Sequence, residues 1–175
     1  MPKKNQPNLF LIGGMRCGST TLHNLLAQHP DIFMSSVKEP VFYKAEHLRR
    51  KVARGDNSER TKSKLIKAEA SGRYRTPEAY YSLFDGVKSE TYVGESSHYF
   101  YGPSFGKTIA EDEPETRILL IVRDPIKRFY SEYGYYLKAG TLKGSFEDYA
   151  KEQLKVAIER EIDGPDSRLA KGLYT

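Results

Sequence analysis

The sequence lacks several features that mark large classes of proteins. None of its apolar runs approaches the roughly 18 residues that a membrane-spanning helix needs. The lysines of MPKKNQPN at the N-terminus are not followed by an apolar stretch, so no secretory signal peptide is predicted. The single cysteine, Cys17, excludes an internal disulfide. We therefore expect a cytoplasmic protein in a reducing compartment.

Signatures of metal sites and of repeats are missing as well. The four histidines are scattered, and neither a Cys/His cluster nor an HExxH motif occurs, so we expect no metal centre. No internal repeat or low-complexity linker divides the 175 residues, which suffice for one domain over residues 1–175. The net charge of +5 favours anionic ligands such as phosphates, and we expect no nucleic-acid partner.

The alternation of apolar runs and helical patterns predicts the fold class. Strands are expected at residues 8–12, 32–34, 91–94 and 117–122, the last apolar enough to be buried on both faces of a sheet. Helices are expected to begin near Ser19, Pro77, Pro125 and Ser145, with Thr76, Asp124 and Ser145 as caps and Asp148 completing a capping box. This alternation predicts an α/β fold with a central parallel sheet.

A basic segment interrupts the pattern between Ala45 and Arg75. It is rich in Lys and Arg and poor in large apolar residues, which is typical of surface helices and loops. A groove for an acidic polysaccharide is the alternative interpretation of this segment.

A glycine-rich loop follows the first strand. Gly13 and Gly18 have the spacing of a phosphate-binding P-loop, and hydroxyl side chains occupy positions 19–21. The helix that starts there adds the positive end of its dipole. However, Ser19 stands where a P-loop carries lysine, and the cation of the loop is Arg16. The pattern predicts a nucleotide-phosphate site that differs from that of an ATPase.

The residues alone leave two interpretations of this loop open. In an NTPase or kinase, the strand at 117–122 would end in a metal-binding Asp124, yet the lysine that reaches the β- and γ-phosphates is missing. Asp124 before Pro125 is equally well explained as a helix cap. In the second interpretation the nucleotide is not a triphosphate, and Arg123 at the strand end binds one of its phosphates.

Three segments resemble the sulfotransferases that use 3′-phosphoadenosine 5′-phosphosulfate (PAPS), in particular bacterial members related to the heparan sulfate branch. The segments are GGMRCGSTTL, QHPDIFMSSVKEPVFY and RILLIVRDPIKRFYSEY, and they occur in the family's order. The resemblance implies a P-loop-like three-layer α/β fold. It also implies in-line transfer of a sulfuryl group from PAPS to a hydroxyl or amine of a small molecule or carbohydrate, with 3′,5′-ADP released and no metal involved.

The resemblance assigns the cofactor site residue by residue. Arg16 stands where the family places a cation beside the leaving phosphosulfate, and Arg123 and Ser131 match the pair that holds the 3′-phosphate. The residues implied in PAPS binding are Arg16, Cys17, Gly18, Ser19, Thr20, Thr21, Arg123 and Ser131. Arg128 lies in the same motif without an assigned role.

The resemblance also points to the catalytic base. Arg16 is the implied catalytic cation, and Glu39 matches the glutamate that acts as general base in the heparan sulfate branch. Two residues after this glutamate the family often has a histidine, whereas this sequence has Val41. A Glu–His arrangement is therefore not expected from this motif. His98, which follows a short strand, is a rival base.

The sequence stops at Thr175, sooner after the 3′-phosphate motif than is usual for the family, and it contains no tryptophan. We expect residues 1–175 to form the N-terminal part of a sulfotransferase-like domain; a complete compact form is the alternative. A module that binds PAPS or 3′,5′-ADP without turning it over also stays open, and a P-loop kinase is a third interpretation.

Overall fold

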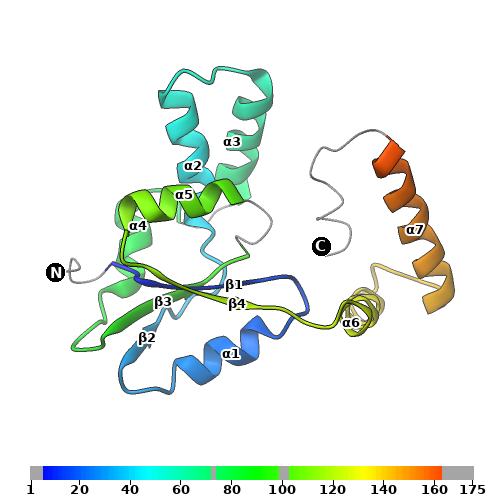
Figure 1. Ribbon diagram of the computed structural model, residues 1–175, viewed down its shortest axis with the longest axis horizontal. Coiled ribbons are helices and arrows are strands. Elements are labelled where there is room, and N and C mark those ends of the chain that lie inside the picture. Colours follow the sequence, from blue (N-terminus) through cyan, green and yellow to red (C-terminus); the bar gives the residue numbers. More distant parts are fainter. Residues whose placement is uncertain (1–5, 72–73, 99–102, 163–175) are drawn as a thin grey trace. The chain divides into compact units, whose positions relative to one another are not determined.

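The computed structural model describes residues 6–71, 74–98 and 103–162 (Figure 1). The chain divides into two compact units. The first holds the residues up to Gly13 together with Ser19–Leu120, and the second holds Gly14–Gly18 together with the residues from Ile121 onward. The expectation of one domain over residues 1–175 stays a prediction.

A four-stranded parallel sheet is the centre of the first unit, with the strand order β2-β3-β1-β4. The strands are β1 (Leu9–Gly13), β2 (Ile32–Met34), β3 (Tyr92–Ser96) and β4 (Arg117–Ile121). β3 pairs in parallel with both neighbours, with Phe10 of β1 opposite Glu95 and Phe33 of β2 opposite Val93. The predicted α/β class with a central parallel sheet is confirmed.

The burial of β4 corrects one prediction. The side chains of Ile118, Leu119 and Leu120 are 50%, 38% and 51% exposed, although this strand was expected to be buried on both faces. The strand order gives the reason, because among the described strands β4 lies at the edge of the sheet, beside β1 alone. Residues 9–11 of β1, an interior strand, are buried. An apolar run does not by itself distinguish an edge strand from a central one.

Helices cover both faces of the sheet (Figure 1). On one face lies α1 (Ser19–Leu26), where the buried His23 ring is joined to Ser96 of β3 by a hydrogen bond of 2.6 Å. The helical segments of the other face are α2 (Phe42–Ala53), α4 (Pro77–Tyr81), the 3-10 turn η1 (Ser82–Phe84) and α5 (Pro103–Asp112). The sequence analysis did not predict α5, whose buried Ile109 joins the core.

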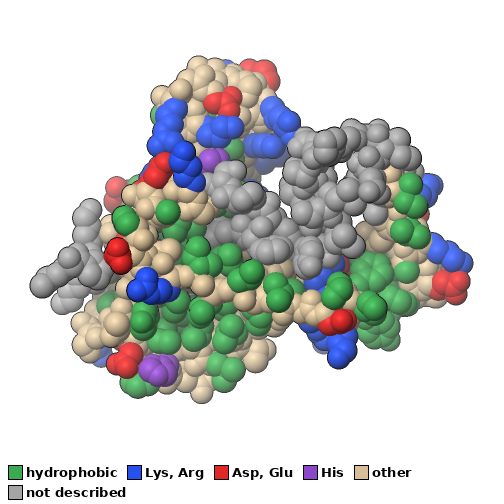
Figure 2. Space-filling model, in the orientation of Figure 1, with side chains coloured by type: hydrophobic (Ala, Val, Ile, Leu, Met, Phe, Trp, Pro, Cys, Tyr) green, Lys and Arg blue, Asp and Glu red, His purple; other side chains and the backbone are tan. Residues whose placement is uncertain are grey.

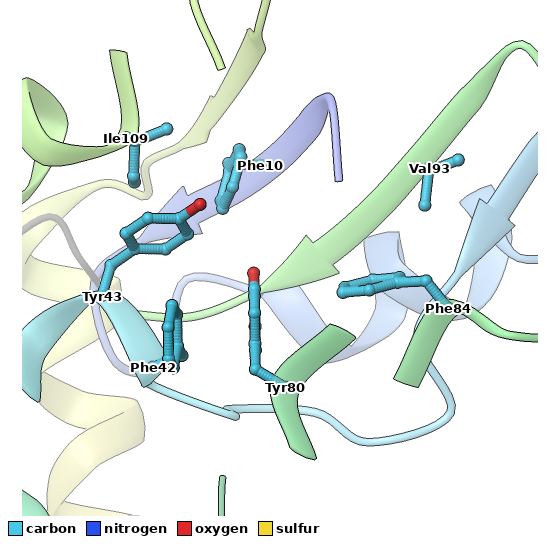
Figure 3. Packing of buried hydrophobic residues seen from close by; sticks show 7 residues of the cluster. All are labelled: Phe10, Phe42, Tyr43, Tyr80, Phe84, Val93 and Ile109. Atoms are coloured by element: carbon cyan, nitrogen blue, oxygen red, sulfur yellow. The ribbon is translucent and has the colours of Figure 1, made fainter. Parts of the chain in front are cut away.

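An aromatic core fills the space between the sheet and the helices that cover this second face (Figure 3). Its buried members are Phe10, Phe42, Tyr43, Tyr80, Phe84, Val93 and Ile109. The rings of Phe42 and Tyr80 stack with their centroids 4.3 Å apart. The Tyr80 hydroxyl donates to Oε1 of the fully buried Glu95 at 3.2 Å. The core therefore combines apolar burial with a partner for an otherwise costly buried carboxylate.

The basic segment forms α2 and α3 (Glu59–Ser71), which pack against each other. Its cations lie beside carboxylates: Arg49 contacts Glu46 and Glu69, and Arg50 contacts Glu46, Glu111 and Asp112. Figure 2 shows Lys and Arg mixed with Asp and Glu over these helices. The predicted surface helices are confirmed, and the carboxylate partners disfavour a groove for an acidic polysaccharide.

The second unit contains α6 (Pro125–Lys138) and α7 (Phe146–Ile162). Both begin at the predicted caps. Asp124 Oδ1 accepts the Lys127 N–H at 2.8 Å, and Ser145 and Asp148 exchange a reciprocal pair of hydrogen bonds as a capping box. The two helices meet through aromatic rings, with Phe129 stacked on Tyr149 at 5.1 Å. Asp124 is thus a helix cap, as one of the two interpretations of this residue proposed.

A buried ion pair lies on α6. Arg128 Nη1 is 3.0 Å from Glu132 Oε2, and the two residues are only 1% and 3% exposed. Their spacing of four residues puts them on one face of the helix. Burial raises the pKa of Glu132, while the charge of Arg128 and its hydrogen bond oppose this. Arg128, the motif residue to which the sequence analysis assigned no role, therefore lies in the interior of the second unit.

Replacing Glu132 with Leu removes this carboxylate from the buried Arg128 guanidinium. We expect a loss of about 3–5 kcal/mol in the free energy of unfolding, measured by urea titration. The double variant Arg128→Met/Glu132→Leu buries no charge at this place and should recover most of that loss. Equal stability of Glu132→Leu and the unmodified chain would contradict a structural role for the pair.

Candidate active site

Four polar side chains gather where β1, β2 and β3 end in the first unit. Ser19 follows β1 in the chain, Lys38 and Glu39 follow β2, and His98 follows β3. The carboxyl ends of parallel strands share one edge of a sheet, which is where α/β proteins bind ligands. The contacts are continuous: Lys38 Nζ lies 3.3 Å from Ser19 Oγ and 3.0 Å from Glu39 Oε1, and Glu39 Oε2 lies 2.5 Å from His98 Nδ1.

The turn that carries Glu39 has a strained backbone held by the end of β3. Glu39 and Val41 have φ angles of 59° and 55°, in the left-handed region that costs a non-glycine residue of order 1–3 kcal/mol. Three hydrogen bonds hold them there. The Glu39 N–H donates to the Ser96 carbonyl at 2.9 Å, the Val41 N–H to Ser97 Oγ at 3.2 Å, and the His98 N–H to Glu39 Oε2 at 2.9 Å.

The buried Glu95 connects this turn to the aromatic core. Ser97 Oγ, which accepts from the turn, donates to Glu95 Oε2 at 2.8 Å, while Tyr80 donates to the other carboxylate oxygen. The hydroxyl of Ser97 is therefore oriented from both sides. A series of hydrogen bonds runs from the core to the backbone beside Glu39.

The electrostatics of Glu39 depend on its two neighbours. Burial raises the pKa of Glu39, but the hydrogen bonds and charges of His98 and Lys38 outweigh this effect and lower it to about 2. At neutral pH the Glu39 carboxylate can only accept hydrogen bonds. Nδ1 of His98 must therefore carry the shared proton, which leaves Nε2 of a neutral His98 ring as an acceptor.

The pairing of Glu39 with His98 differs from the sequence-based expectation. The two residues were rival candidates for the base, and Val41 occupies the place where a histidine partner was sought. The structure supplies that partner from the end of β3, 59 positions away. No spacing rule in the sequence connects these positions, because only the parallel pairing around β3 brings them together.

The second unit gathers the other candidate residues. Arg16 lies in the glycine loop with a φ angle of 63°, and its carbonyl accepts from Arg123 Nη1 at 3.1 Å. Its side chain reaches Ser131, where Nε donates to Oγ at 3.3 Å. Within the described residues neither Arg16 nor Arg123 forms an ion pair. The Arg123 guanidinium thus meets the backbone of Arg16, while the Arg16 guanidinium lies against α6. No carboxylate of the described residues is within ion-pair distance of either group, although the charge of Arg16 acts on Glu132 at longer range.

The remaining loop residues have mixed surroundings. Gly18 has a φ angle of 98°, which glycine adopts without strain. Cys17 is buried, and its N–H closes a turn on the Gly14 carbonyl at 3.2 Å. Thr20 and Thr21 lie exposed on the first turn of α1. Their cofactor roles stay predictions.

A pocket of about 570 Å³ lies along α6 in the second unit. Its lining residues are Arg16, Tyr130, Ser131, Gly134, Tyr135, Lys138 and Ala139. The sequence analysis named Arg16 and Ser131 but none of the other lining residues. The available signal was spacing, because Tyr135 follows Ser131 by one helical turn and shares its face.

Among residues 6–71, 74–98 and 103–162, no group of three or more His, Cys, Asp or Glu side chains is placed to hold a metal ion. Within the same ranges, none of the helices combines the length and the apolar character needed to cross a bilayer.

Comparison with known proteins decides the family. The model of the Sulfotransferase family matches residues 7–163. The chain belongs to the sulfotransferase family. It is similar to the crystal structure of a sulfotransferase from Alicyclobacillus acidocaldarius, with a TM-score of 0.67 and 26% identity over 97% of this chain and 64% of that one. The expected resemblance and the P-loop-like α/β fold are confirmed.

Two relatives of this chain have names that refer to carbohydrate or heparan sulfate. Carbohydrate sulfotransferase 15 of Rattus norvegicus is 24% identical over 86% of this chain. The bifunctional heparan sulfate N-deacetylase/N-sulfotransferase 1 of Caenorhabditis elegans is 26% identical over 77% of it. The matches cover 31% and 13% of those proteins, so the chain spans a minor part of their length.

The Glu39–His98 contact should make the free energy of unfolding depend on pH. Folding lowers the pKa of Glu39 from 4.5 to about 2, so its ionised form stabilises the fold above pH 4.5, and this contribution disappears as the pH falls toward 2. The difference in free energy of unfolding between the unmodified chain and Glu39→Gln should shrink over that interval in urea titrations. The difference should also be smaller in a His98→Ala background. A difference that stays constant down to pH 2 would argue against the pairing.

Proposed function

We propose that this chain transfers a sulfuryl group from PAPS to a hydroxyl or amine group of a carbohydrate acceptor. The observation that carries the proposal is the Glu39–His98 pair, joined through Lys38 to the loop hydroxyl Ser19, in a chain of the sulfotransferase family. The names of the relatives, a carbohydrate sulfotransferase and a heparan sulfate N-sulfotransferase, support a sugar as the acceptor.

The donor set suits a ligand with phosphate and sulfate groups. Arg16 and Arg123 form no ion pair within the described residues, and Ser131 adds a hydroxyl. Arginine is well matched to phosphate oxygens because its planar group offers several N–H donors. Arg123 and Ser131 would hold the 3′-phosphate, while Arg16 would neutralise charge on the bridging oxygen as it leaves. The loop amides and the start of α1 would bind the 5′-phosphosulfate.

We assign His98 as the general base that takes the proton from the acceptor group. The hydrogen bonds and charges around Glu39 hold its pKa below the ordinary value, which makes its carboxylate a weak base, whereas Nε2 of an imidazole can take a proton while Nδ1–H remains on Glu39. His98 takes the proton as the acceptor oxygen or nitrogen forms its bond to sulfur, and the bond from sulfur to the bridging oxygen breaks to release 3′,5′-ADP. Glu39 orients the ring through Nδ1–H and stabilises the imidazolium that results. Lys38, which donates to the other carboxylate oxygen, adds to the effect of His98 in lowering the pKa of Glu39.

Nucleotide selectivity tests the donor assignment. Calorimetry should show binding of 3′,5′-ADP that is tighter than binding of 5′-AMP, with no gain from ATP and magnesium. Arg123→Ala should weaken the binding of 3′,5′-ADP by about 10- to 100-fold, because it removes charged hydrogen bonds to phosphate. The same variant should weaken the binding of 5′-AMP less.

Lys127→Ala, which removes an exposed cation from the first turn of α6, is the matched control and should change neither affinity. Binding of ATP with magnesium and indifference to the 3′-phosphate would refute PAPS as the donor and favour a kinase. Equal losses for 3′,5′-ADP and 5′-AMP in Arg123→Ala would refute the assigned role of Arg123.

Radiolabelled sulfate transfer to a panel of glycans, phenols and lipids tests catalysis. His98→Ala should lower kcat by about 10²- to 10⁴-fold without weakening 3′,5′-ADP, and added imidazole should restore part of the rate. His29→Ala, in an exposed residue just after α1, is the control for loss of a histidine. Full activity of His98→Ala beside an inactive Glu39→Gln would instead make Glu39 the base. Nucleotide binding with no transfer to any acceptor would leave a binding module.

A further inference from the structure

The guanidinium of Arg16 lies on an aromatic ring that no part of the proposed chemistry uses. Arg16 Cζ is 5.0 Å from the centroid of the Tyr135 ring, within the range of a cation–π interaction. Its Nε donates to Ser131 Oγ at 3.3 Å. Ser131 and Tyr135 are one turn apart on α6, so one face of this helix supports the guanidinium at two points.

The backbone of Arg16 is held independently of its side chain. The residue has a left-handed φ of 63°, and Arg123 donates to its carbonyl at 3.1 Å. These contacts place the Cα atom but leave the long side chain free to rotate. Ordering such a side chain only when a ligand binds costs affinity, and contacts that order it beforehand reduce this cost. The ring of Tyr135 and the hydroxyl of Ser131 select one orientation.

Tyr135 contacts Arg16 through its aromatic ring and not through its phenol oxygen. Among the described residues the Tyr135 hydroxyl forms no hydrogen bond, and its other ring contact is with the neighbouring Tyr136 at 5.5 Å. Tyr135 is 46% exposed, so its side chain is not needed to fill an apolar interior. The contact that the exposed ring makes with a charged group is therefore the one with Arg16, which forms no ion pair within the described chain.

We propose that Tyr135 is a positioning residue that holds the Arg16 guanidinium ready for the anionic end of the nucleotide. The inference rests on the proposed function, because it takes Arg16 as the cation that meets the phosphosulfate. It assigns to Tyr135 no contact with the reacting atoms. In the contrary arrangement, the ring would stack directly on the ligand within the pocket along α6.

A double-mutant cycle separates these arrangements. Calorimetry with 3′,5′-ADP should show that Tyr135→Leu weakens binding about five-fold, the value of an exposed cation–π contact, whereas Tyr135→Phe keeps the ring and retains the affinity. In an Arg16→Met background, Tyr135→Leu should cause no further loss. A full additional loss in that background would show that the ring acts on the ligand itself, and would overturn the proposal.

A fluorescence measurement tests the contact without any turnover. The chain contains no tryptophan, so Tyr135→Trp introduces a single indole that can replace the ring beneath Arg16. Without nucleotide, its emission should differ between Tyr135→Trp and Arg16→Met/Tyr135→Trp. Addition of 3′,5′-ADP should change the emission only where Arg16 is present, because the ligand acts on the indole through the guanidinium.

The two proposals fail in different ways. If the unmodified chain does not bind 3′,5′-ADP, the proposed function falls, while the indole emission without nucleotide still reports whether the ring carries Arg16. If that emission is the same with and without Arg16, the positioning role of Tyr135 is overturned whatever the nucleotide does.

Discussion

The hydrogen bonds at the end of β3 are the constraint on which the candidate site of the first unit depends. The Ser96 carbonyl, the Ser97 hydroxyl and the His98 backbone and ring all contact the turn that carries Glu39. A left-handed backbone at two non-glycine residues persists only where its surroundings compensate, and here one strand end supplies that compensation. The buried Glu95 accepts hydrogen bonds from Tyr80 and Ser97 and extends this support into the aromatic core, so the core and the candidate site are joined by one series of hydrogen bonds.

The described cations differ in whether a carboxylate lies within ion-pair distance. The cations of α2 that contact α3 and α5 have carboxylate partners and join those helices at the surface. In the second unit, Arg16 and Arg123 form no ion pair within the described residues and contact a hydroxyl, a ring and a carbonyl instead. A net charge of +5 did not distinguish these two kinds of arginine. The partners in the fold do, and they direct the search for an anionic ligand to the glycine loop and α6.

Much of the fold was predictable because its signals are local. The strands follow short apolar runs, and Thr76, Asp124 and Ser145 cap helices where their side chains can satisfy the free N–H groups of a first turn. The predictions failed where the outcome depends on neighbours. β4 is as apolar as a central strand, yet it is exposed because it lies at an edge of the described sheet. α5 was missed, although Ile109 packs into the core.

The family, the glycine loop with Arg16, and Arg123 after β4 can all be identified from short segments of the sequence, because residue type and order carry the information in such segments. Which of these residues lie in contact follows from the folded chain. Glu39 and His98 pair across 59 positions, and Arg16 reaches Ser131 across 115, since parallel pairing of β2 with β3 and the face of α6 bring distant segments into contact. Such pairings have no local signature, because the contacts that select them form only when the chain is folded.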